Sequence, residues 1–206
     1  MIDETAIERE LRAAAATREA GHQLPDLGAA AATAGLLDVA YATLDSPLGT
    51  LLLARTDRGL VRLAYVDYES EDEVIAELAS RISPRVLAVP RRLDPIRREL
   101  DQYFTGSRHE FDVAIDWRLT HGFGRRVLRA TAQIPYGDVS SYKQVAAAAG
   151  SPRGFRAAGN ALGANPIPIV VPCHRVLHSG GGLGGYTGGL ERKQLLLDVE
   201  RSAPAE

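Results

Sequence analysis

The segment YATLDSPLGTLLLARTDRGLVRLAYV, residues 41–66, restricts the possible folds of this chain most strongly. Three apolar runs are separated by SPLG and TDRG, whose Pro, Gly, Ser and Asp residues are typical of tight turns. Apolar runs joined by such turns are typical of neighbouring antiparallel strands. The segment therefore predicts a small antiparallel sheet.

Two helices are expected after this sheet. Ser70 can cap a helix through EDEVIAELASRI, because its hydroxyl can accept a hydrogen bond from a free N–H of the first turn. LDPIRRELDQYF indicates a second helix, with Asp94 as its N-cap and Pro95 at the first helical position. The first half of the chain is thus predicted to combine a sheet with helices.

The second half is expected to be mostly helical. The helix expected from FGRRVLRATAQI has one mostly apolar face, formed by Phe123, Val127, Leu128 and Ile134. PYGDVSSYKQVAAAAG then predicts a turn and a short helix that ends at Gly150. The predicted fold class is α/β in the α+β sense, with a small N-terminal antiparallel sheet and helices followed by a mostly helical C-terminal domain.

The segment SPRGFRAAGNALGANP, residues 151–166, predicts the next helix. Ser151 is its expected N-cap, Pro152 its first residue, and the helix must end before Pro166. Two short helices joined by a tight turn suggest a helix-turn-helix. Small residues line the second helix, and they allow either close approach to a grooved surface or close packing on another helix: Ala157, Ala158, Gly159, Ala161, Gly163 and Ala164.

Three regions are expected along the chain. Residues 1–38 form an N-terminal extension of unknown role, with an amphipathic helix around Ile7 and Leu11. Residues 39–118 form an N-terminal α/β domain, and residues 119–206 form the C-terminal domain.

Charge is distributed unevenly, although the formal net charge is only −2. Residues 1–121 carry −7, whereas residues 122–178 carry +6, with seven Lys or Arg residues and the single acid Asp138. The basic segment contains the cysteine. This asymmetry indicates either a polyanionic partner at that surface or a solvated face of arginines.

The sequence also excludes several classes of protein. It has no apolar run long enough to span a bilayer, and its acidic, helical N-terminus differs from a secretory signal. One cysteine excludes an internal disulfide and leaves too few soft ligands for a Cys-rich zinc site. We therefore expect a cytoplasmic protein that binds no membrane, no metal and no cofactor.

Cys173, the only cysteine, lies in NPIPIVVPCHRVLHSGGGLGGYTGGLERK. A lone cysteine beside an apolar run is typical of a core residue at a strand end. A reactive thiol needs a base or a positive field, because its unperturbed pKa is about 8.5. His174 and Arg175 follow directly and can supply both, and Pro172 restricts the backbone before the thiol. These neighbours favour a chemical role for Cys173.

Three blocks of sequence are specific in their order and spacing: IPYGDVSSY at 134–142, RAAGNALGANPIPIVVPCHRV at 156–176 and GGLGGYTGGLERKQLLLDVE at 181–200. In these blocks the chain resembles the O6-alkylguanine-DNA alkyltransferases, also called methylated-DNA–protein-cysteine methyltransferases. The resemblance is weaker in residues 41–121. It implies a C-terminal domain that binds double-stranded DNA, flips out an O6-alkylguanine and transfers the alkyl group once, stoichiometrically, to Cys173.

The resemblance also implies roles for single residues. Cys173 is the nucleophile and alkyl acceptor, and His174 is its base, acting through a water molecule. Glu200 holds the imidazole in place. Asn165 corresponds to a hinge residue between the recognition helix and the cysteine.

On the DNA side, the resemblance makes Arg156 the finger that fills the place of the flipped nucleotide, while Tyr142 crowds the phosphate that rotates. The recognition helix is expected in the minor groove, and the wider DNA-binding set adds Ser151, Arg153, Ala157 and Gly159. Tyr186 forms a wall of the guanine pocket, where glycines let the flat base approach. The other expected pocket residues are Tyr142, Pro168, Val176 and Thr187.

The chain departs from the family pattern at several points. Phe123 and Gly124 stand where relatives often have a Phe-Gln pair, and Gly163 stands where some carry a basic residue, which weakens the expected DNA contact. The zinc site of some relatives cannot be built here. Residues 1–38 have no recognised counterpart.

Two other functions stay open. A lesion-binding protein of the same fold would lack the nucleophile, whereas Cys173 is present. A cysteine hydrolase would need direct contact between Cys173 and His174, which is awkward at a strand end because adjacent side chains point to opposite sides. The sequence leaves open the alkyl size, activity on O4-alkylthymine and self-contacts on DNA. A monomer in solution is expected, associated with the nucleoid if the source is bacterial.

Overall fold

The part of the chain that the computed structural model describes comprises residues 28, 31 and 33–202. The chain divides into two compact units, residues 1–36 and 37–206. The helix expected around Ile7 and Leu11 lies outside the described residues. All elements discussed below belong to the second unit.

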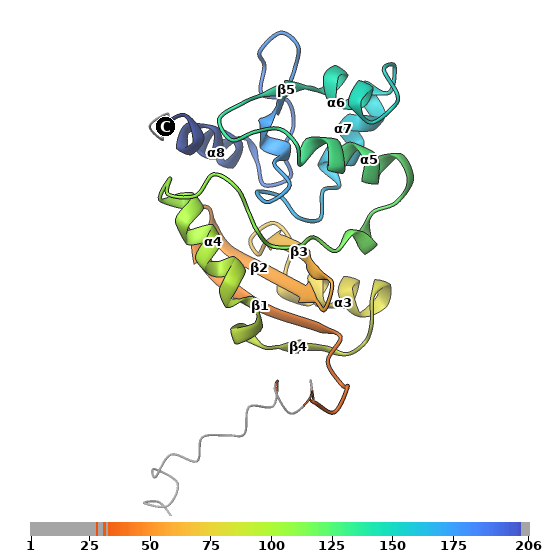
Figure 1. Ribbon diagram of the computed structural model, residues 1–206, viewed down its shortest axis with the longest axis vertical. Helices are drawn as coiled ribbons and strands as arrows, with labels where there is room; N and C mark the ends of the chain where they lie inside the picture. Colours follow the sequence, from red (N-terminus) through yellow and green to blue (C-terminus); the bar gives the residue numbers. More distant parts are fainter. Residues whose placement is uncertain (1–27, 29–30, 32, 203–206) are drawn as a thin grey trace, which may run out of the picture. The chain divides into compact units, whose positions relative to one another are not determined.

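A four-stranded sheet forms the first half of this unit (Figure 1). The strands β1 (Val39–Ser46), β2 (Gly49–Thr56) and β3 (Gly59–Tyr65) pair antiparallel in sequence, as predicted. A fourth strand, β4 (Val86–Ala88), pairs with β1 in parallel, so the order is β3-β2-β1-β4 and the sheet is mixed. The antiparallel prediction misses β4, because three partly exposed residues carry too short a pattern to indicate a strand.

The predicted turns lie where the strands reverse. Ser46 pairs with Gly49 across SPLG, and Thr56 pairs with Gly59 across TDRG. Gly59 has a φ of 137°, and a Cβ there would lie 2.1 Å from the carbonyl oxygen of Ala114. Only glycine therefore allows this close approach.

Different helices cover the two faces of the sheet. On one face, α3 (Glu71–Arg81) contributes buried Val74 and Leu78. On the other face, α4 (Asp94–Phe104) contributes buried Ile96, Leu100 and Tyr103. Leu52 of β2 belongs to the first core, whereas its neighbours Leu51 and Leu53 belong to the second, as the period of two in a strand requires. The second core continues into the C-terminal half of the chain.

One of the two capping predictions for this half is confirmed. Ser70 is the N-cap of α3 and forms a capping box with Glu73, whose carboxylate accepts from Ser70 N at 2.9 Å. The prediction of Asp94 as N-cap of α4 is wrong. A 3₁₀ turn, Pro90–Leu93, runs directly into the helix, so Leu93 is the N-cap and Asp94 is already helical.

The second half is mostly helical, as predicted. Its elements are η2 (Trp117–Leu119), α5 (Gly122–Thr131), β5 (Ser140–Ser141), α6 (Tyr142–Ala148), α7 (Phe155–Gly163), η3 (Cys173–Arg175), β6 (Val176–Leu177) and α8 (Leu190–Ser202). The helices α6 and α7 contact each other and α5, which gives the predicted pair of short helices (Figure 1). The α+β fold class is confirmed. Within the described ranges, no helix combines the length and apolar character that a membrane span needs.

The helix α7 begins later than predicted. Its N-cap is Gly154, without a side-chain cap, and its first residue is Phe155. The carbonyl oxygen of Ser151 accepts a hydrogen bond from Gly154 N at 2.8 Å, which closes a turn around Pro152 and Arg153. Ser151 is therefore not the N-cap, because the stretch after it forms the turn between two helices.

Candidate active site

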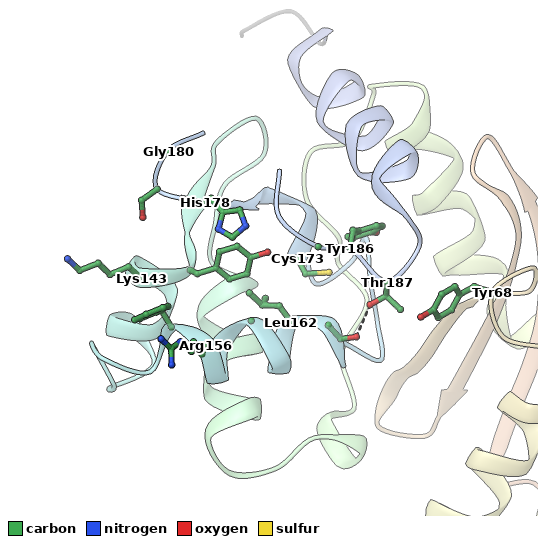
Figure 2. Close-up of a pocket in the computed structure, with 15 residues that line it drawn as sticks. Tyr68, Lys143, Arg156, Leu162, Cys173, His178, Gly180, Tyr186 and Thr187 are labelled. Atoms are coloured by element: carbon green, nitrogen blue, oxygen red, sulfur yellow. Dashed lines mark hydrogen bonds between the residues drawn. The ribbon is translucent and has the colours of Figure 1, made fainter. Parts of the chain in front are cut away.

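The thiol of Cys173 lies at a pocket of about 900 Å³ (Figure 2). Cys173 is only 5% exposed, and it opens the 3₁₀ turn η3 instead of lying at a strand end. In the segment before it, Ile169 has a φ of 72°, the only positive φ of a non-glycine residue in the part of the chain described. A β-branched residue in this region costs on the order of 1–3 kcal/mol. The backbone is therefore strained in the turn that leads to the thiol.

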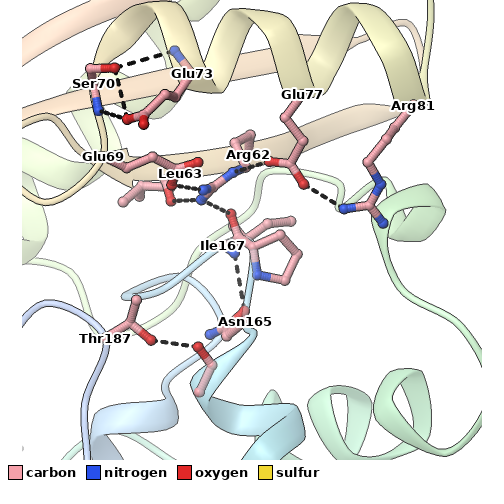
Figure 3. A network of polar contacts seen from close by, with 12 residues as sticks. Arg62, Leu63, Glu69, Ser70, Glu73, Glu77, Arg81, Asn165, Ile167 and Thr187 are labelled. Atoms are coloured by element: carbon pink, nitrogen blue, oxygen red, sulfur yellow. Dashed lines mark hydrogen bonds and ion pairs between the residues drawn. The ribbon is translucent and has the colours of Figure 1, made fainter.

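Asn165 binds the thiol from the end of α7. Its side-chain amide donates to Cys173 Sγ at 3.2 Å and to the carbonyl oxygen of Val171 at 2.9 Å. Its Oδ1 accepts from Ile167 N at 3.0 Å (Figure 3). One buried side chain thus connects the end of the helix, the strained turn and the sulfur.

Behind the thiol, His174 and Glu200 form a buried pair. His174 Nε2 lies 2.8 Å from Glu200 Oε1, and Tyr103 of α4 donates to the same oxygen at 2.6 Å. Arg175 donates to the carboxylate from Nε and Nη2 at 2.9–3.1 Å. The His174 Nδ1 atom is buried and has no hydrogen-bond partner among the residues that the structure describes. With Nε2 bound to the carboxylate, Nδ1 is the ring atom that can accept a proton.

The pair is ionised at Glu200 and neutral at His174. Burial opposes the ionisation of Glu200, but hydrogen bonds from His174 and Arg175 outweigh it and lower the pKa to about 2. Burial lowers the pKa of His174, and Glu200 offsets this only in part. The site therefore combines a fixed carboxylate with an imidazole that can take up a proton.

Arg175 does not provide the positive field that its position next to Cys173 predicts. Its guanidinium binds Glu200 and donates to the carbonyl oxygen of Ile134 at 2.5 Å. Its charge is therefore balanced behind the imidazole, because the 3₁₀ turn directs consecutive side chains to different sides.

Lys193 of α8 is the cation that acts on the thiol. Burial raises the pKa of Cys173 to about 11, while the hydrogen bond from Asn165 and the charge of Lys193 act against this rise. Lys193 is itself buried, which lowers its pKa to about 8, and its Nζ donates to the carbonyl oxygens of Val176 at 2.7 Å and Gly185 at 3.4 Å. Lys193 is not among the residues predicted at the site. Its position on the buried face of α8, together with Leu196, Leu197 and Glu200, is the signal that could have indicated a role.

Six of the residues expected at the site or on the DNA surface line the pocket: Tyr142, Arg156, Gly159, Cys173, Tyr186 and Thr187 (Figure 2). Five larger side chains line it without having been predicted there: Tyr68, Lys143, Phe155, Leu162 and His178. Two expected pocket residues lie elsewhere. Pro168 lines a neighbouring cavity of about 350 Å³, and Val176 is fully buried in the core.

The pocket walls are held by close contacts. Gly184 has a φ of 68°, and a Cβ there would lie 2.4 Å from Tyr142 Oη, so glycine is required beside this ring. The ring of Tyr142 packs beside that of His178, with 5.2 Å between centroids. Thr187 donates to the carbonyl oxygen of Gly163 at 2.7 Å, which links the glycine-rich loop to the end of α7 (Figure 2).

The small residues of α7 divide between two faces. Ala158 is fully buried, and Ala161 lies only 3.8 Å from the Cβ position of Gly124 on α5, so this face packs on another helix. The other face is exposed and includes Arg156, Ala157, Gly163 and Ala164. Each of the two interpretations of these small residues thus applies to one face. Among the other expected DNA-binding residues, Arg153 is exposed, whereas Ser151 and Gly159 are partly buried.

In the part of the chain that the structure describes, no three or more His, Cys, Asp or Glu side chains lie together so that they could hold a metal ion.

Comparison with known proteins places both halves of the second unit in one enzyme family. Residues 122–202 match the family model of the 6-O-methylguanine DNA methyltransferase, DNA binding domain. Residues 39–117 match the model of the 6-O-methylguanine DNA methyltransferase, ribonuclease-like domain.

Alignments with individual relatives cover most of this chain and most of each relative. The methylated-DNA–protein-cysteine methyltransferase of Mycolicibacterium paratuberculosis is 44% identical over 163 residues, covering 79% of this chain and 93% of the relative. The inducible enzyme of that name from Bacillus subtilis is 40% identical over 156 residues, covering 75% and 86%. The crystal structure of Mycobacterium tuberculosis OGT in complex with DNA is 40% identical with a TM-score of 0.68, covering 81% of this chain and 96% of that chain.

Proposed function

Because the chain belongs to the 6-O-methylguanine DNA methyltransferase family and repairs DNA by alkyl transfer to a cysteine, we propose that Cys173 is the acceptor. One observation carries this assignment. The only cysteine of the chain lies at the pocket. Its sulfur accepts a hydrogen bond from Asn165, and the His174–Glu200 pair lies behind it. No other side chain of the pocket offers a comparable nucleophile.

The proposed reaction is a displacement at the alkyl carbon. A bond forms between Cys173 Sγ and this carbon while the bond from the carbon to O6 of guanine breaks. The departing guanine anion takes up one proton, which balances the proton lost by the thiol. Since the thiol pKa is about 11, the thiol is protonated at pH 7 and must lose its proton as it reacts.

We assign the acceptance of that proton to His174. Its Nε2 is bound to Glu200, and its buried Nδ1 has no partner among the described protein groups, so a water molecule at Nδ1 can pass on the thiol proton. Glu200 then stabilises the imidazolium. A direct thiol–imidazole pair, as in a cysteine hydrolase, is not part of this arrangement.

DNA reaches this thiol only if the damaged nucleotide leaves the stack, because Cys173 is buried. Arg156 is exposed at the pocket, and its guanidinium lies 5.7 Å from the ring centroid of Phe155. Lys143, also exposed, lines the same pocket. This position supports Arg156 as the side chain that fills the vacated place, with Tyr142 next to the rotating backbone.

The test uses duplex DNA with a radiolabelled O6-methylguanine. We expect one labelled methyl group per protein molecule, recovered on the peptide that contains Cys173, without added metal or cofactor. Cys173→Ser should accept no label but should still bind the duplex, because a serine hydroxyl is too weakly acidic to replace the thiol. Label on another residue, or repeated turnover of a hydrolysable ester or amide, would contradict the proposal.

A further inference from the structure

We infer that Tyr65, a residue of the N-terminal sheet, is a positioning residue for the alkyl transfer and acts through Tyr186 on the base in the pocket. The inference rests on the proposed function of Cys173. It extends that function to a strand whose residues do not line the pocket.

The two tyrosines meet at their hydroxyl groups. Tyr65 is the last residue of β3 and is 3% exposed. Its Oη lies 2.8 Å from Tyr186 Oη, and the two rings meet edge to face at 65°, with 6.3 Å between centroids. Tyr186 lines the pocket, and its ring stands nearly perpendicular to that of His174, 6.5 Å away. Tyr186 therefore has the sheet on one side and the reaction site on the other.

The hydroxyl pair fixes the ring of Tyr186. Burial raises the pKa of both phenols well above the ordinary value, so both stay neutral and each hydroxyl needs a hydrogen-bond partner. Each is the partner of the other. Two phenylalanines would give the pocket wall a similar shape without burying any hydroxyl group. The hydrogen bond between the two tyrosines additionally fixes the position of the Tyr186 ring edge.

Tyr65 is in turn held from two sides by the segment that carries Tyr186. The guanidinium of Arg192 lies 4.7 Å from the Tyr65 ring centroid and donates to the carbonyl oxygen of Gly188 at 2.9 Å. A Cβ on Gly188 would lie 2.6 Å from the Tyr65 ring. The same arginine donates to the carbonyl oxygen of Leu48 at 2.7 Å, which anchors it on the sheet. The position of the pocket wall is thus set by the strand β3.

A shift of this wall affects the chemistry because displacement requires the alkyl carbon to be aligned with Sγ. Misalignment of reacting atoms by a fraction of an ångström slows such reactions. The loss of one neutral hydrogen bond that holds the wall is expected to slow transfer by about three- to tenfold.

The experiment measures single-turnover transfer by the full-length chain and its Tyr65→Phe, Tyr186→Phe and double variants. Two probes are used, O6-methylguanine as the free base and the same lesion in a duplex. We expect each single variant to lose the same factor of about three to ten with both probes. The double variant should be no slower than either single variant, because one hydrogen bond is lost in all three.

Tyr41→Phe is the matched control. Tyr41 lies on β1 and packs against the other core of the sheet, with Glu71 near its hydroxyl. The rate of this variant should equal that of the unmodified protein. Thermal melting of every variant then separates lost stability from lost positioning, since rates are compared well below each melting temperature.

Each other outcome overturns the inference. An unchanged rate for Tyr65→Phe, multiplicative losses in the double variant, or a loss confined to the duplex would show that Tyr65 does not act through Tyr186 on the base. Absence of transfer in the unmodified protein would instead contradict the role of Cys173 itself, so the two failures are distinguishable.

Discussion

Arg156 is the residue at which base flipping and chemistry can be separated by one substitution. Arg156→Ala should slow repair of a duplex by about tenfold or more, because the place of the flipped nucleotide is no longer filled. Dealkylation of free O6-methylguanine should stay within about twofold, since no stack has to be opened. Single-turnover rates with both substrates provide the measurement, and equal slowing would refute the finger assignment.

The protonation states of Cys173 and His174 determine how the rate depends on pH. Burial raises the thiol pKa to about 11, and burial lowers the pKa of His174, so the imidazole is already neutral at pH 7. The reacting form, a protonated thiol with a neutral imidazole, therefore predominates from pH 7 to 8, and transfer from the free base should be nearly independent of pH over this range. Above about pH 8 the rate should fall, because Lys193, whose pKa is about 8, loses the charge that acts on the thiol. A rate that rises about tenfold per pH unit would contradict the transfer of the thiol proton to His174, because it would show that a thiolate formed beforehand is the reacting species.

Neighbouring residues in the sequence could be recognised as chemical partners, but their contacts could not. Cys173, His174 and Arg175 form one tripeptide, yet the guanidinium binds Glu200 and leaves the thiol to the charge of Lys193. The direction of each side chain depends on the 3₁₀ turn, which the apolar run before the cysteine does not indicate.

At the scale of elements, short-range hydrogen bonds were the predictable part. Ser70 caps α3 as expected, because an N-cap needs only a backbone N–H three residues further on, and the structure adds the reciprocal hydrogen bonds of Glu73, which were not predicted. Ser151 has the same capping chemistry, but the Pro152–Arg153 turn uses its carbonyl oxygen before the helix begins. The strand β4 depends on pairing with β1, which no local pattern records.

The turn before α7 carries Arg153, whose contact with DNA phosphate can be tested by the salt dependence of DNA affinity. The net +6 of residues 122–178 predicts few phosphate contacts, so log affinity against log salt should have a slope of roughly −2 to −5. Arg153→Ala should reduce the magnitude of this slope by about one unit if Arg153 binds a phosphate.

The control for this measurement is Arg98→Ala, on the exposed face of α4, which should leave the slope unchanged. Arg62 would be unsuitable, because it is paired with Glu69 and Glu77 and donates to the carbonyl oxygen of Pro166 at 3.3 Å (Figure 3). A slope near −10, or equal effects of Arg98 and Arg153, would show that another face binds the DNA.

At the scale of the whole molecule, Glu200 contributes to stability as well as to the site. Glu200→Gln should lower the free energy of unfolding at pH 7 by about 3–5 kcal/mol, because Arg175 is left as an unpaired buried charge. Urea unfolding measures this, with Glu191→Gln on the exposed face of α8 as the control.

The pH dependence of that difference has a definite sign. The pKa of Glu200 is about 2 in the folded protein and about 4.3 in an unfolded chain. Its ionisation therefore stabilises the fold fully above about pH 4.3, and this stabilisation is lost as the pH falls towards 2. A Glu200→Gln difference that is as large at pH 3 as at pH 7 would contradict this origin.

The fold class and the order of the two halves could be predicted from the sequence, whereas the hydrogen bonds between the halves could not. Tyr103 lies 97 residues from Glu200, and Tyr65 lies 121 residues from Tyr186, and both pairs are hydrogen-bonded across the two halves. Such pairs leave no periodic signal. The division at residues 118 and 119, the cytoplasmic location and the monomeric state stay predictions.

The pairing of His174 with Glu200 also has a consequence for the biosynthesis of the protein. His174 and Glu200 are 26 residues apart, and α8 contains the later of the two. A ribosome that adds about 5–20 residues per second makes Cys173 one to several seconds before the carboxylate behind its base. Until α8 has docked, the nascent chain carries this thiol without the carboxylate that stabilises the imidazolium of His174. The site around Cys173 is therefore complete only after residue 200 has been made and α8 has packed against η3.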